Sequence, residues 1–128
     1  MTADDSDVAP GIRAQLASLA RRSKCRTSEW SVGSPTEWAP YQVLNPESGI
    51  PFSGPGAWRL VVNLLESGEP LQEVTLSHPP GAKAYVMLVR LDPAGPEIYI
   101  KIQLGRGKII GRSFHYSYGR DLTGEPDE

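Results

Sequence analysis

A strand of alternating isoleucines and polar side chains lies near the C-terminal end of the chain. Residues 97–104 read Glu-Ile-Tyr-Ile-Lys-Ile-Gln-Leu, and successive side chains of a strand point to opposite faces. The apolar residues therefore share one face, and Tyr99, Lys101 and Gln103 share the other. These three supply a phenol, a cation and an amide within about 14 Å of strand. Solvent-facing strand positions often carry Thr, Lys or Glu, and the combination of Tyr, Lys and Gln differs from that pattern. These three residues are therefore a candidate site.

The next strand, Lys108 to about Ser117, is expected to lie beside the first, because the turn Gly105-Arg106-Gly107 between them is short. Phe114 is expected to face the core together with Ile110. The face that carries Lys101 then also carries Ser113, His115 and Ser117.

Two residues of this strand leave alternatives open. Strict alternation puts Arg112 on the core face, whereas a bulge at Gly111 would turn it outward. His115 is the candidate for proton transfer, because the ordinary pKa of histidine lies near neutral pH. The alternative for His115 is a packed ring that bonds to a backbone carbonyl.

Cleavage of RNA is a reaction that Lys, Tyr, Gln, Arg and His can carry out together without a metal or another cofactor. The 2′-hydroxyl is an internal nucleophile, and it needs a base, an acid for the leaving oxygen and cations for the phosphorane charge. A basic sheet face with exposed aromatic rings also suits single-stranded RNA, whose bases stack on such rings. Two histidines and one cysteine, widely separated, give no zinc pattern.

Two helices are predicted to support this sheet. The long one covers about residues 55–67, where five apolar residues repeat at helical spacing; Ser53 or Gly54 caps its start and Gly68 ends it. A shorter one runs roughly from Pro10 to Arg22. The apolar face of the long helix is formed by Ala57, Leu60, Val61, Leu64 and Leu65.

The fold class expected from these elements is α+β. Residues 73–78 and 84–91 read as two further strands, which makes a four-stranded antiparallel meander with the long helix packed on one face. Residues 27–55 form a Pro- and Trp-rich loop, and its aromatic residues are expected to pin it onto the core. Those aromatic residues are Trp30, Trp38, Tyr41 and Phe52.

A chain of 128 residues is expected to form a single α+β domain over residues 10–120, with a disordered N-terminus at 1–9 and an acidic tail at 121–128. Residues 81–120 hold seven basic and two acidic side chains, whereas the tail holds four acidic and no basic ones. Such a basic block can attract phosphates or an acidic partner, or it is an ordinary solvated strand face. No apolar run spans a membrane and no signal peptide is visible, so a cytoplasmic location is expected.

The two C-terminal strands carry a resemblance to a known family. The run Tyr99-Ile-Lys-Ile-Gln-Leu, followed after a turn by Gly111-Arg-Ser-Phe-His-Tyr-Ser, resembles the C-terminal half of MqsR-like and RelE-like ribonuclease toxins of bacterial type II toxin–antitoxin systems. Matching features cover about residues 57–118. These toxins share a helix-plus-antiparallel-sheet fold with barnase-like, EndoU-like and colicin-type ribonucleases. MqsR-like toxins have a lysine after Ser-Phe, where this chain has His115, and that departure changes the proton chemistry.

The resemblance implies a metal-independent endoribonuclease that cuts messenger RNA and is held inactive by a small antitoxin protein. His115 would be the general acid or base, and Lys101 and Arg112 would stabilise the phosphate. Tyr99 and Gln103 would orient the ribose or a base. Tyr85 is a weaker candidate that can equally belong to the core. The substrate-binding candidates are Lys83, Tyr85, Arg106, Tyr116 and Ser117.

A non-catalytic module is the competing hypothesis. The same sheet face could bind RNA or an acidic protein without cutting anything, as an antitoxin-like or immunity-like interaction protein would. In a further alternative, the acidic tail folds back onto the basic face and screens it.

Overall fold

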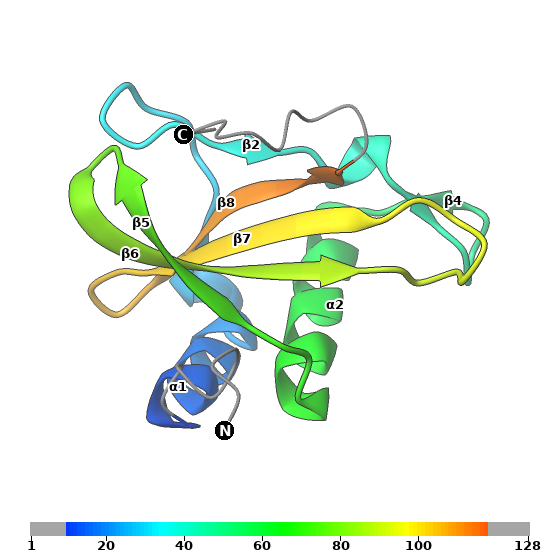
Figure 1. Ribbon diagram of the computed structural model, residues 1–128, viewed down its shortest axis with the longest axis horizontal. Coiled ribbons are helices and arrows are strands. Elements are labelled where there is room, and N and C mark those ends of the chain that lie inside the picture. The colour runs from blue at the N-terminus through cyan, green and yellow to red at the C-terminus, as the bar shows by residue number, and fades with distance from the viewer. Residues whose placement is uncertain (1–9, 118–128) are drawn as a thin grey trace.

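The computed structural model describes residues 10–117 as a curved β-sheet with two helices on one of its faces (Figure 1). Helix α1 spans Pro10–Ala20 and helix α2 spans Gly54–Ser67. This arrangement confirms the α+β class. The expected disordered start at 1–9 and the acidic tail at 121–128 lie outside the described residues. Within residues 10–117, no helix is long and apolar enough to cross a membrane.

Four consecutive strands form the expected antiparallel run, but the sheet is larger than the four-stranded meander predicted. Two more strands, β1 and β2, pair in parallel with the outer side of β8. Each is only two residues long, and so short a strand has no periodicity that a sequence could display. The strands of this sheet are β1 Arg26–Thr27, β2 Glu37–Trp38, β5 Gln72–Ser77, β6 Pro80–Val89, β7 Ile98–Leu104 and β8 Ile109–Tyr116.

Helix α2 has the ends and the apolar face that its sequence predicts. The Ser53 hydroxyl accepts a hydrogen bond from the Gly56 amide at 3.0 Å, and Gly68 ends the helix in the left-handed conformation at φ 86°. Helix α1 packs against α2, and Arg21, just beyond its end, forms an ion pair with Glu66. The buried residues of α2 are Ala57, Trp58, Val61, Leu64 and Leu65.

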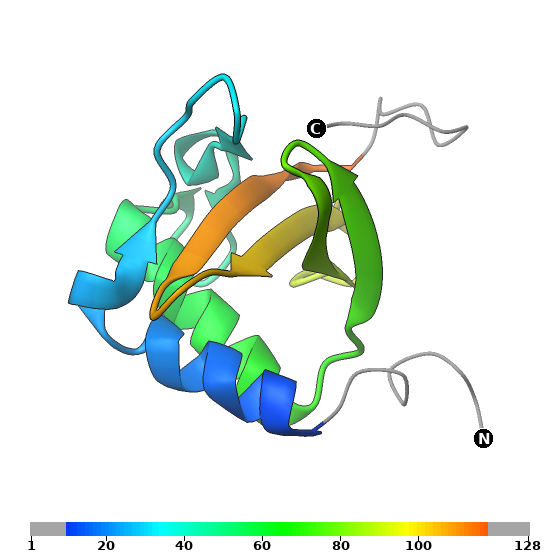
Figure 2. The ribbon, with the colours of Figure 1, turned by 90° about the vertical axis from the view of Figure 1, so that its left-hand side faces the viewer.

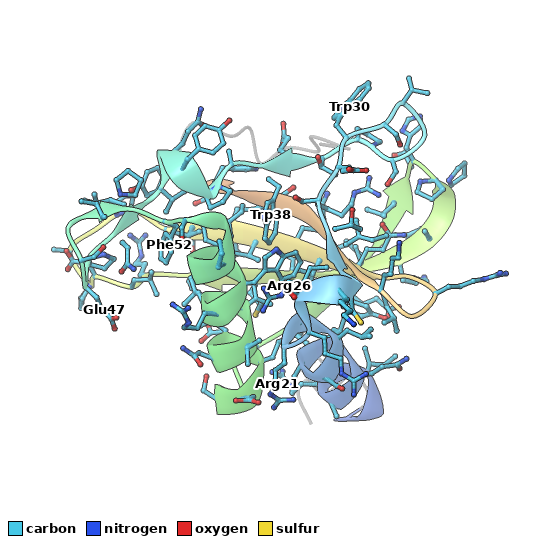
Figure 3. All side chains as sticks on the ribbon, turned by 180° about the vertical axis from the view of Figure 1, so that it is seen from behind. Arg21, Arg26, Trp30, Trp38, Glu47 and Phe52 are labelled. Atoms are coloured by element: carbon cyan, nitrogen blue, oxygen red, sulfur yellow. The ribbon has the colours of Figure 1, made fainter. Side chains whose placement is uncertain are left out.

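The segment 27–55 is not a structureless loop. Besides β2 it contains the 3₁₀ turn η3 (Pro40–Gln42) and the small hairpin of β3 (Leu44–Asn45) and β4 (Ile50–Pro51). Trp38 stacks on Trp58 of α2 with ring centroids 4.7 Å apart, and Phe52 is buried with its ring edge-to-face against Phe114, 5.5 Å between centroids. Figure 3 shows Trp38 and Phe52 over α2, with Trp30 far out on its loop. The pinning role is therefore confirmed for Trp38 and Phe52, whereas Trp30 and Tyr41 are exposed.

A β-bulge interrupts the pairing of β7 with β8. Lys101 pairs with Ser113 but Ile102 pairs with Gly111, so Arg112 is an extra residue on β8. The bulge reverses the facing of the residues before it. Ile109, rather than the expected Ile110, is therefore fully buried in the core.

Gly111 occupies the one position of the bulge where the indole of Trp38 lies against the backbone. A Cβ atom added at Gly111 would lie 2.6 Å from Cε3 of Trp38, well inside van der Waals contact. The glycine is therefore required by the close approach of the ring.

Replacing this glycine tests the contact. We expect Gly111→Ala to lower the free energy of unfolding by about 1–3 kcal/mol, because the indole is held between Trp58 and Phe114 and has little room to move. Urea denaturation measures the change. Gly11→Ala in α1 is the matched control, since nothing lies within 4 Å of its added methyl group, and it should not destabilise the protein. Equal stability of the two variants would contradict the proposed constraint.

Candidate functional site

The sequence-predicted site residues of β7 and β8 do share one face of the sheet, the face turned away from the helices. Tyr99 pairs with His115, and Lys101 pairs with Ser113. The bulge brings Arg112 onto the same side, where its guanidinium reaches Gln103. We call this set the polar face; its members are Tyr99, Lys101, Gln103, Arg112, Ser113 and His115.

Much of the polar face is buried, contrary to the expectation that it faces solvent. Lys101 is 2% exposed and Arg112 is 1% exposed, and Gln103 is also buried. The sheet curves so strongly that the β5–β6 hairpin turns toward the loop before β2 (Figure 2). That hairpin and the segment 28–36 close over the face from two sides. Simple alternation could not predict this closure, because it depends on segments far away in the sequence.

Arg112 holds these walls together. Its Nη1 donates to Oε1 of Gln103 at 2.9 Å and to Oγ of Ser34 at 3.0 Å, and its Nη2 donates to the carbonyl oxygen of His78 at 2.7 Å. The three acceptors belong to β7, to the segment before β2 and to the turn between β5 and β6. Charge-assisted hydrogen bonds of this kind offset the cost of burying a cation. Arg112 is therefore a positioning residue that joins three parts of the fold.

A carboxylate that the sequence analysis missed completes the site. Glu37 of β2 pairs in parallel register with Ser113, which brings its side chain beside the next residue on that face of β8, His115. Oε1 of Glu37 lies 3.2 Å from Nε2 of His115. The imidazole is 17% exposed and the carboxylate 55% exposed, so solvent reaches the pair. Nothing near Glu37 in the sequence signals this role, because the strand that places it is two residues long.

The second nitrogen of the imidazole has a backbone partner. Nδ1 of His115 lies 2.9 Å from the carbonyl oxygen of Tyr116, an acceptor, so this nitrogen donates. The imidazolium form can donate to both Tyr116 and Glu37 at once, whereas the neutral ring has one N–H for two acceptors. The arrangement fixes the plane of the ring and points Nε2 toward the carboxylate.

Two further side chains extend this pair into the sheet. The Tyr99 ring stacks on the His115 ring, with centroids 5.4 Å apart and planes 10° apart. Nζ of Lys101 lies 6.0 Å from the centroid of the Tyr99 ring. An ammonium, a phenol, an imidazole and a carboxylate therefore follow one another from the buried part of the face to the surface.

The surface end of this series opens into a hollow of about 330 Å³. The hollow is shallow and widely open to solvent. Its lining includes both members of the Glu37–His115 pair and two residues of η3. The lining residues are Glu37, Ala39, Tyr41, Gln42 and His115.

The remaining substrate-binding candidates lie away from this hollow. Lys83 donates to Oγ1 of Thr75 at 3.0 Å and lies near the carboxylate of Glu73. Tyr85 belongs to the hydrophobic core, and burial raises the pKa of its phenol above the usual value, with the charge of Glu73 adding to the effect. Arg106 is exposed in the β7–β8 turn.

Tyr116 and Ser117 support the edge of the sheet. The Tyr116 hydroxyl accepts a hydrogen bond from the Leu44 amide at 2.9 Å, which ties β8 to the small hairpin. The Ser117 hydroxyl donates to Oε1 of Glu97 at 2.8 Å. Both contacts are structural ties, and neither side chain lines the hollow.

Comparison with protein-family models, with curated proteins and with solved structures found no match. The resemblance to ribonuclease toxins therefore rests on the sequence motifs of residues 99–104 and 111–117 alone. Residues 10–117 contain no group of three or more His, Cys, Asp or Glu side chains placed to bind a metal ion.

The role of Arg112 leads to a stability prediction. We expect Arg112→Met to lower the free energy of unfolding by about 2–5 kcal/mol, because three acceptors lose their donor. The midpoint and slope of urea denaturation measure the loss. Arg106→Met is the matched control, since that side chain is exposed in a turn, and it should change stability by no more than about 0.5 kcal/mol. An Arg112→Met protein as stable as the control would show that the buried guanidinium does not join the walls.

Proposed function

We propose that the protein is a metal-independent endoribonuclease whose reaction takes place at the Glu37–His115 pair. The observation that carries the proposal is this carboxylate–imidazole pair, 3.2 Å apart and open to a hollow of about 330 Å³. The two groups supply a proton acceptor and a proton donor, and cleavage through the 2′-hydroxyl requires both, one on each side of phosphorus. In this proposal the exposed Glu37 side chain turns away from His115 when the phosphate enters between them.

The roles follow from the hydrogen-bond partners. The Glu37 carboxylate accepts the proton of the 2′-hydroxyl while the 2′-oxygen bonds to phosphorus. The His115 imidazolium gives its Nε2 proton to the 5′-oxygen as the P–O bond to it breaks. The products are a 2′,3′-cyclic phosphate and a free 5′-hydroxyl, and atoms and charge balance without a co-reactant.

The other members of the polar face lie on the buried side of the Glu37–His115 pair and act on it from there. Lys101 places a positive charge in a buried environment, where its field is weakly screened and favours the negative charge that develops on the phosphorane. Tyr99 keeps the imidazole in its plane by stacking. Arg112 and Gln103 bond to each other, so they position the walls of the site rather than bind phosphate.

The resemblance extends the proposal to a biological class. MqsR-like and RelE-like toxins cut messenger RNA and are inhibited by a small antitoxin protein, and we propose the same substrate and kind of partner for this chain. The strand motif at Tyr99 to Leu104 and the Ser113-Phe114 pair support this extension. The packing of α2 against an antiparallel sheet also agrees with it.

A non-catalytic binding module is the second candidate. Because Lys101 and Arg112 are almost completely covered by protein, such a module would bind its partner through the exposed side chains around the hollow rather than through these two cations. This candidate predicts that RNA or an acidic protein binds without being cut. Replacement of His115 distinguishes the two candidates, because it stops cleavage if the protein is a nuclease and matters little if the protein only binds.

Cleavage of a single-stranded RNA oligonucleotide in the presence of EDTA tests the proposal. We expect the wild-type protein to release 2′,3′-cyclic phosphate ends, and His115→Ala and Glu37→Gln to slow cleavage by about 10²–10⁴-fold. A DNA oligonucleotide of the same sequence should stay intact, because it lacks the 2′-hydroxyl. Circular dichroism confirms that the variants remain folded.

Matched controls separate the site from general charge effects. His78→Ala removes the imidazole of the other described histidine, which is exposed, and Glu47→Gln neutralises a carboxylate outside the 330 Å³ hollow. Both should cut RNA at the wild-type rate. RNA that stays intact with wild-type protein, or cleavage that survives His115→Ala, would reject the catalytic proposal.

A further inference from the structure

Two exposed side chains beside the Glu37–His115 pair have no evident structural task. Tyr41 is 65% exposed, and within residues 10–117 neither its ring nor its hydroxyl has a stacking or hydrogen-bonding partner. Gln42 is also exposed, and among the same residues its side-chain amide makes no hydrogen bond. Both line the hollow that contains His115. An exposed aromatic ring and a free amide are the groups that bind an unpaired nucleobase.

Hydrogen bonds hold the backbone that carries these side chains on both sides of the turn. The Ala39 amide donates to the carbonyl oxygen of Phe114 at 3.1 Å, which extends the pairing of β2 with β8. The 3₁₀ turn is then closed by a bond from the Val43 amide to the carbonyl oxygen of Pro40 at 2.9 Å. Pro40 and Val43 are buried, while Tyr41 and Gln42 between them face solvent. The ring is therefore presented by a fixed turn, so little backbone entropy is lost when a ligand stacks on it.

We propose that Tyr41 and Gln42 form a subsite for one unpaired base of single-stranded RNA, adjacent to the phosphate that Glu37 and His115 attack. Tyr41 stacks on the face of the base, and the Gln42 amide bonds to its edge as both donor and acceptor. This inference rests on the proposed function for the position of the scissile phosphate. The binding of a base at Tyr41 does not depend on cleavage.

Alternative positions for an RNA base are less well supported. Trp30 is exposed, but it lies on the segment 28–36 and does not line the hollow with His115. Tyr99 is already stacked on His115. A second hollow of about 180 Å³ lies between α2 and residues 45–47, away from every member of the polar face. Tyr41 is therefore the exposed ring that the structure places next to the proton-transfer pair.

Binding is measured on the His115→Ala protein, so that cleavage does not interfere. The probe is a short single-stranded RNA that contains 2-aminopurine, whose fluorescence is quenched when it stacks on an aromatic ring. We expect Tyr41→Ala to weaken binding by about 5- to 150-fold and to remove the quenching. Tyr41→Phe, which keeps the ring, should restore both. The same sequence as a duplex should bind much more weakly, because its bases are not available for stacking.

Trp30→Ala is the matched control, since it removes an exposed aromatic ring outside the hollow. It should leave affinity and quenching unchanged. Equal loss with Trp30→Ala and Tyr41→Ala would overturn the subsite, because binding would then be spread over the surface. Unchanged binding by Tyr41→Ala would overturn it as well.

The amide is tested through selectivity. With oligonucleotides that differ in one base, Gln42→Leu should reduce the difference in affinity between the bases and leave the stacking signal in place. A wild-type protein with no preference to lose would remove Gln42 from the subsite.

The two proposals can fail separately. If wild-type protein cuts RNA but Tyr41→Ala changes neither KM nor kcat, the nuclease proposal stands and the base subsite is wrong. If nothing is cut but binding still depends on Tyr41, the subsite proposal holds, and the protein is a non-catalytic RNA-binding module. If the probe does not bind at all, the subsite is wrong.

Discussion

The extra residue in β8 is the constraint on which the rest of the structure depends. It reverses the facing of the strand between Gly111 and Ser113. On the helix side, the missing side chain of Gly111 admits the indole of Trp38. On the opposite side, Arg112 reaches Gln103, Ser34 and the carbonyl oxygen of His78. One irregularity in the ladder therefore fixes the core and the polar face together.

Burial of two cations in so small a domain needs a compensating arrangement. A guanidinium is suited to it, because its planar donors can bond to several acceptors at once, and Arg112 does so across three segments. Lys101 has the π-face of Tyr99 on one side. Burial costs stability, but it also strengthens the field of each charge at nearby groups. The polar face is therefore better suited to act on the surface pair through its charge than to contact a polyanion directly.

Local patterns in the sequence predict α2 and the faces of β7, because these depend on neighbours a few residues apart. The shared face of Tyr99, Lys101 and His115 follows from the same alternation. Glu37 and Tyr41 could not be found that way. Glu37 lies on a two-residue strand that pairs in parallel with β8, and Tyr41 lies on the 3₁₀ turn that follows it. This pairing depends on the packing of Trp38 against Phe114 rather than on any periodicity. The burial of Arg112 likewise depends on two distant segments that cover it.

The side chains around the hollow alternate with side chains that are anchored in the core. Glu37 precedes Trp38, which packs between Trp58 and Phe114. His115 follows Phe114, which is fully buried. Because neighbours along a strand point to opposite faces, each anchor fixes the direction of the functional group next to it. The aromatic core therefore sets where the carboxylate and the imidazole stand, and the proposed proton transfer depends on this positioning. Substitutions that change the packing of that core would therefore move the carboxylate and the imidazole through the backbone of β2 and β8.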